Sequence, residues 1–123
     1  MARPHCLLDV MIRLTFEWRE VANLLATFGV VLPEDAVGEG ERIYALANDL
    51  AHGRRRFRNF LIRHFRRRFR REIRLVSSMT MPQIEKLLTR RTMARHPGLL
   101  WALASDERPV VVKLGRSWAQ RER

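Results

Sequence analysis

The chain has 123 residues, of which 46% are hydrophobic, enough for the core of one domain and too short for a multidomain enzyme. Its 24 Lys and Arg against 13 Asp and Glu give a net charge of +11, and 22 of those 24 are Arg. Dense Leu, Val and Phe clusters exclude disorder throughout the chain. The excess of Arg over Lys favours binding of phosphate or carboxylate groups, because a guanidinium group can form two hydrogen bonds to either of them. A GC-rich genome would also enrich Arg.

The N-terminal region predicts a cytoplasmic protein. Cys6 is the lone cysteine and cannot form an intrachain disulfide, which is typical of a reducing compartment. Asp9 and Arg13 follow the first apolar residues and break any signal-peptide core. Because no apolar run approaches the ~20 residues that span a bilayer, we expect no membrane partner.

Residues 7–28 fit two patterns. Their apolar residues recur at helical spacings of three and four: Leu7, Met11, Leu14, Trp18, Val21, Leu25 and Phe28. Residues 10–18 also alternate between apolar and polar side chains, as a strand does. We favour a helix because the helical stripe extends beyond the alternating stretch, and a short β segment around 10–18 is the alternative.

A loop with Pro33, Gly38 and Gly40 precedes a second helix, which either ends near Gly53 or continues into the Arg-rich segment.

The spacing of apolar residues predicts an Arg-rich amphipathic helix over residues 54–76. At 100° per residue, one face holds the apolar side chains of Phe57, Leu61, Phe65, Phe69, Ile73 and Val76, which we predict to be buried. The opposite sector holds arginines. With the neighbouring Arg55 they make eight candidate nucleic-acid-binding residues, called here the Arg set: Arg55, Arg56, Arg63, Arg66, Arg67, Arg70, Arg71 and Arg74.

The Arg set concentrates the charge of the chain. Residues 1–53 carry −4, residues 54–74 carry +10 and residues 75–123 carry +5. Like charges at i,i+3 and i,i+4 repel, and only Glu72 offsets them, through Arg68. A polyanion would neutralise this face, so nucleic acid is favoured over an acidic protein, an anionic membrane surface or a merely solvated face.

The C-terminal third contains shorter elements. Thr80 is near an N-cap position and Pro82 fits the first turn of a helix over 82–91. An apolar helix over 97–103 should be buried, with Trp101 as a core anchor, which argues against a winged helix-turn-helix. Residues 109–114 are expected to be a strand or extended arm, and residues 116–123 a polar tail.

Signals for catalysis or cofactors are weak. The four histidines (His5, His52, His64 and His96) are scattered, so we predict no metal site. The acidic residues lack a His, Ser or Cys partner in a recognisable array, and GEG at 38–40 lacks the Lys of a phosphate loop. We therefore expect no enzyme and no cofactor.

The overall prediction is a mainly α protein: a single domain over 1–123 that forms a compact helical bundle of four or five helices. In size, helicity and basic face the chain resembles the helical small subunits of CRISPR effector complexes. That resemblance implies a subunit that lines a nucleoprotein complex and supports a guide-target duplex or a displaced strand. From the residues alone, the Arg set predicts sequence-independent backbone binding to DNA or RNA. The alternative is a structural adaptor that docks on an acidic protein, with other subunits or a second copy as partners.

Overall fold

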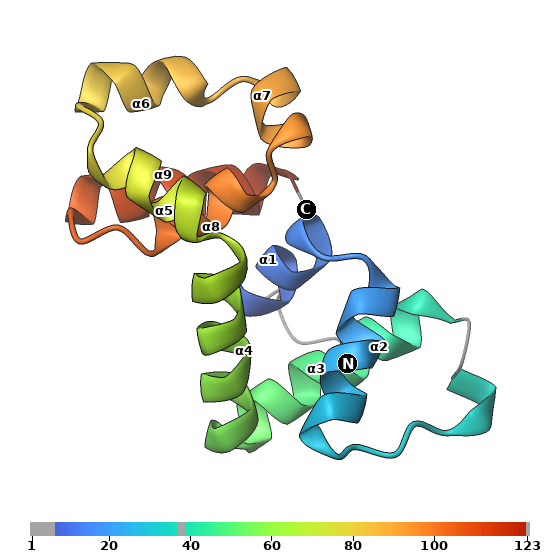
Figure 1. The fold of residues 1–123 in the computed structure, drawn as a ribbon. Coiled ribbons are helices and arrows are strands. Elements are labelled where there is room, and N and C mark those ends of the chain that lie inside the picture. Colours follow the sequence, from blue (N-terminus) through green and yellow to red (C-terminus); the bar gives the residue numbers. More distant parts are fainter. Residues whose placement is uncertain (1–6, 37–38, 123) are drawn as a thin grey trace. The chain divides into compact units, whose positions relative to one another are not determined.

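A computed structural model describes residues 7–36 and 39–122, so Cys6 and Gly38 lie outside the described residues. Within those ranges the chain forms nine α-helices, one short 3-10 helix and no strand (Figure 1). The prediction of a mainly helical protein is confirmed. Four or five helices is too few, and the β segments around 10–18 and 109–114 are wrong.

The chain divides into two compact units, Met1–His64 and Phe65–Arg123. The prediction of one domain over 1–123 stays a prediction, which cooperative unfolding would test. The first unit contains the following elements: α1 (Leu7–Thr15), α2 (Trp18–Phe28), η1 (Glu34–Ala36), α3 (Gly40–Gly53) and the beginning of α4 (Arg55–Arg68).

The helical interpretation of residues 7–28 is confirmed, but the helix is interrupted after Thr15. Glu17 is extended, with φ −73° and ψ 151°, and serves as the N-cap residue of α2. Phe16 is buried at this break, and its carbonyl accepts a hydrogen bond from the Tyr44 hydroxyl of α3. The Phe16 carbonyl therefore keeps a hydrogen-bond partner although the helix is interrupted there.

Helix α3 packs against both α1 and α2. Ile43, Ala47 and Ala51 point into this core and are fully buried. The helix ends at Gly53, because Arg54 is extended with φ −129° and ψ 108°. Of the two alternatives for this helix, an end near Gly53 is therefore correct and continuation is not.

The second unit begins within α4 and continues with five helices: α5 (Arg70–Ser77), α6 (Met81–Leu87), α7 (Arg90–Arg95), α8 (Gly98–Ala104) and α9 (Pro109–Glu122). Helix α8 packs against α5 and α9 (Figure 1). Every residue from Gly98 to Leu103 is buried. The burial of this apolar helix and of Trp101 is confirmed. An apolar, buried helix cannot serve as a base-reading recognition helix.

Two threonines divide the segment that we expected to be one helix over 82–91. Thr80 and Gln83 form a capping box at the start of α6, and Pro82 lies in its first turn, as predicted. Thr89 then caps α7, because its hydroxyl accepts a hydrogen bond from the Thr92 N–H at 3.1 Å. The helix over 82–91 is therefore two short helices.

The strand over 109–114 is wrong, because α9 extends from Pro109 to Glu122 and so includes most of the segment that we expected to be a polar tail. Val111, Gly115 and Ala119 are spaced by four residues and all are buried. A Cβ on Gly115 would approach the side chain of Leu103 to 2.8 Å, so α9 and α8 lie very close together. This burial pattern outweighs the β propensity of the valines.

The Arg-rich helix over 54–76 is not continuous. Helix α4 ends at Arg68, Phe69 has φ −112° and ψ 29°, and α5 begins at Arg70. A Cβ on Gly98 would overlap the Phe69 ring, so the ring is seated against the start of α8. Of the six side chains predicted to be buried, five are: Phe57, Leu61, Phe65, Phe69 and Val76. Ile73 is only half-buried, which corrects its assignment.

Candidate nucleic-acid interface

The Arg set is exposed along its whole length, and the unit boundary divides it. Three members belong to the first unit: Arg55, Arg56 and Arg63. Five belong to the second unit: Arg66, Arg67, Arg70, Arg71 and Arg74. None of the eight pairs with another side chain among the residues that the structure describes. Their guanidinium groups are therefore available to an external anion.

The second unit carries almost all of the net charge. Residues 65–123 contain 15 Lys and Arg against 5 Asp and Glu, which gives +10. Residues 1–64 contain 9 against 8, which gives +1. A unit with this excess attracts polyanions over the distance of a Debye length, about 10 Å at 0.1 M salt.

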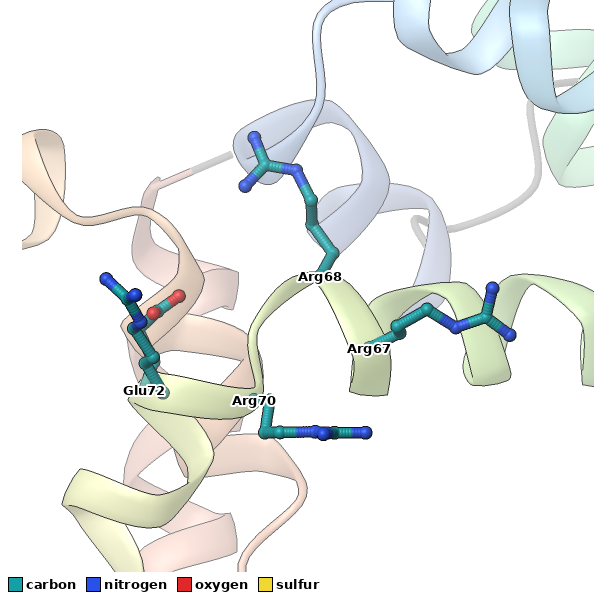
Figure 2. A pocket seen from close by; sticks show the side chains of 5 residues that line it. Arg67, Arg68, Arg70 and Glu72 are labelled. Carbon is teal, nitrogen blue, oxygen red and sulfur yellow. The ribbon is translucent and has the colours of Figure 1, made fainter.

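The break at Phe69 creates an open hollow of about 490 Å³, called here the Arg hollow, which is lined by Arg67, Arg68, Arg70, Arg71 and Glu72. These side chains come from the last turn of α4 and the first turn of α5. Figure 2 shows Arg67 and Arg70 extending to one side, whereas Arg68 leaves the chain on another. The arginines thus surround an open space instead of following one straight helix face.

Sequence reasoning missed two residues of the Arg hollow. Arg68 was assigned to an ion pair with Glu72, but Glu72 forms no ion pair in the described part of the chain. The Arg68 guanidinium lies 5.3 Å from the centre of the Phe69 ring. The apolar periodicity continues through Phe69, so no signal in the sequence marked the break that brings these residues to one hollow.

Arg108 is a basic residue with a structural role. Its guanidinium donates to the Val76 carbonyl at 2.8 Å and the Met79 carbonyl at 2.6 Å, at the end of α5. It also pairs with Asp106 at 2.8 Å. This hydrogen bond lowers the pKa of Asp106 and raises that of Arg108. Arg108 thus ties the turn before α9 to the end of the helix that carries Arg70, Arg71 and Arg74.

His64 belongs to the packing of the first unit. Its ring centre lies 5.6 Å from that of Phe16, and its Nε2 lies 3.4 Å from the Glu20 carboxylate. Within residues 7–36 and 39–122, no group of three or more His, Cys, Asp or Glu is placed to hold a metal ion. No helix in those ranges is both long enough and apolar enough to cross a membrane.

Comparisons of the chain with protein-family models, with curated proteins and with solved structures found no significant match.

Proposed function

We propose that this protein is a non-catalytic subunit that binds a nucleic-acid backbone without reading its sequence. The observation that carries the proposal is the group of five exposed arginines around the junction of α4 and α5: Arg66, Arg67, Arg70, Arg71 and Arg74. None of them has a protein partner among the described residues, and they lie on a unit with a net charge of +10.

Nucleic acid suits these arginines for a chemical reason. A guanidinium group forms two parallel hydrogen bonds to a phosphate, and neighbouring phosphates continue along the strand. Binding also removes the repulsion between like charges at i,i+3 and i,i+4 within α5, which are those of Arg70, Arg71 and Arg74. The most apolar short helix, α8, is buried and offers no polar side chains to base edges. Backbone contacts without base contacts give affinity without sequence preference.

The expected resemblance to helical small subunits of CRISPR effector complexes would make the chain part of a larger nucleoprotein assembly, and this is part of the proposal. The competing role is an adaptor that uses the same arginines to pair with the carboxylates of an acidic protein. A guanidinium group forms the same pair of hydrogen bonds to a carboxylate and to a phosphate. Only an experiment can therefore distinguish the adaptor from the nucleic-acid-binding subunit.

Binding of single- and double-stranded DNA and RNA, measured by electrophoretic shift over a range of salt, tests the proposal. With five to seven phosphate contacts, the log of affinity should fall against log salt with a slope of about −3.5 to −6. Two unrelated sequences should bind equally. Absence of binding, or affinity that does not depend on salt, would refute the proposal. Capture of one acidic protein by preparations free of nucleic acid would favour the adaptor.

A further inference from the structure

The six phenylalanines of the chain divide into two groups by exposure. Four of them are buried, with at most 4% of their surface exposed: Phe16, Phe57, Phe65 and Phe69. Phe28 and Phe60 are partly exposed, and their rings lie beside each other with centres 5.4 Å apart. The core therefore encloses four of the rings, and the other two form one pair at its edge, called here the Phe pair.

Both members of the Phe pair belong to the first unit. Phe28 is the last residue of α2, and Phe60 lies in the second turn of α4. The Phe57 ring packs against both of them, with its centre 5.1 Å from that of Phe28 and 6.2 Å from that of Phe60. Because Phe57 is fully buried, it holds the pair against the core while part of each ring stays in contact with solvent.

Phe60 lies on the same side of α4 as two members of the Arg set. Arg56 precedes it by four residues and Arg63 follows it by three, which are the spacings that place side chains on one helix face. Both arginines are exposed and pair with no side chain among the described residues. They are separated by about 10.5 Å along the helix axis. One cationic group therefore lies before the partly exposed ring and one after it.

A ring between two arginines matches the chemistry of single-stranded nucleic acid. Unpaired bases stack on aromatic side chains while basic groups bind the phosphates along the strand. Every base has an aromatic face, so stacking adds affinity without reading the sequence. The bases of a duplex are paired and stacked on one another and cannot reach such a ring. Helix α4 contains no acidic residue, which favours an anionic partner over a purely apolar one.

We propose that the Phe pair is a base-stacking site for single-stranded nucleic acid. In this arrangement an unpaired base stacks on Phe60, and Arg56 and Arg63 bind the phosphates on either side of it. The inference rests on the proposed function and deepens it, because it assigns strandedness to part of the same Arg set. Stacking of one base on a partly exposed ring predicts a gain in affinity of about fivefold.

The test measures affinity for three probes of equal length: single-stranded DNA, its duplex, and a single strand made of tetrahydrofuran abasic nucleotides. The abasic strand keeps every phosphate but has no base. The wild-type protein should bind single-stranded DNA about fivefold more tightly than the abasic strand. Phe60→Leu keeps an apolar side chain against Phe28 but has no ring, so it should bind these two probes equally. Its affinity for the duplex should equal that of the wild type.

Two further variants separate stacking from other effects. Phe60→Tyr keeps the ring and should retain the fivefold ratio, whereas a loss of folding would abolish binding to every probe. Trp118→Leu is the matched control, because this aromatic side chain is also partly exposed and has the Arg121 guanidinium 5.5 Å from its ring centre. It lies in the second unit and should keep the ratio.

The stacking site and the proposed function fail in different ways. Equal binding of single-stranded DNA and the abasic strand by the wild-type protein would overturn the stacking site, as would an unchanged ratio in Phe60→Leu. If all three probes bind equally and with a steep salt dependence, the proposed function stands and the stacking site is wrong. If no probe binds to a protein of normal helical content, the proposed function itself is wrong.

Discussion

The Phe65 ring stacks on the Trp101 indole, with ring centres 3.9 Å apart and planes inclined by 13°. Phe65 is 0% exposed and Trp101 is 8% exposed. The contact joins the last turns of α4 to α8, and so it holds the helix end that bears Arg66 and Arg67. The indole N–H has no acceptor among the described groups, so this tryptophan contributes through packing.

Phe65→Ala should lower the free energy of unfolding by about 3–5 kcal/mol, because it leaves a cavity against the indole. Urea unfolding followed by circular dichroism measures this loss. Leu75→Ala is the control on α5: its side chain is 50% exposed, and its loss should change stability by less than about 0.5 kcal/mol. An unfolding midpoint of Phe65→Ala equal to that of the wild type would contradict the assigned packing.

The apolar periodicity was sufficient to predict the burial of Phe57, Leu61 and Phe65, because a helix repeats every 3.6 residues whatever its neighbours are. It was not sufficient to predict the break at Phe69. That break depends on where the ring packs, which is against Gly98 in a helix far along the chain. Ile73, beyond the break, is accordingly the residue whose burial was overestimated.

The same distinction applies to α9 and to the candidate site. Local propensity favoured a strand for Val110 to Val112, but close packing of Gly115 against α8 selects a helix. Exposure of the Arg set followed from its charge and from its position opposite the apolar face of the predicted helix. The grouping of Arg68 with Glu72 in one hollow depends on the tertiary fold and had no local signal.

Gly98→Ala tests the close approach between α8 and the break. The added Cβ would overlap both the Phe69 ring and the Glu72 carboxylate, so both must move. Overpacking of this kind should cost about 1–3 kcal/mol in thermal or urea unfolding. Gly53→Ala is the matched control, since its Cβ meets nothing within 4 Å. It should be neutral or slightly stabilising, and equal effects of the two substitutions would contradict the predicted overlap.

The pair of Asp106 and Arg108 predicts how stability depends on pH. Asp106 is buried, with 3% of its side chain exposed, and the Arg108 hydrogen bond lowers its pKa from the ordinary value of 3.8. A carboxyl whose pKa is lowered in the folded state stabilises the fold above the unfolded pKa, and this contribution disappears as the pH falls through the folded pKa.

Asp106→Asn should therefore be less stable than the wild type at neutral pH. The difference should shrink once the pH falls below about 4 and should vanish in stronger acid. Thermal unfolding of both proteins at a series of pH values measures it. A difference that stays constant down to the acid limit would show that the ionised pair does not stabilise the second unit.

The last prediction concerns the arginines around the break. Replacing Arg66 and Arg70 together with Gln removes two of the proposed phosphate contacts. The slope of log affinity against log salt should become shallower by about 1.4 on single strands and about 1.8 on duplex. Affinity should fall by the same factor for unrelated sequences, because no base is read. The melting temperature should stay constant or rise, since both side chains are exposed and two charges are removed from a unit of net charge +10.

Arg91→Gln with Arg95→Gln is the matched control. These two arginines are exposed on α7 with the same spacing, and their replacement changes the net charge by the same amount. If the Arg set follows the backbone, the control should leave the salt slope nearly unchanged. If both double variants flatten the slope equally, binding responds to the net charge of the second unit. Loss of affinity for one sequence only would show that these arginines read bases instead of phosphates.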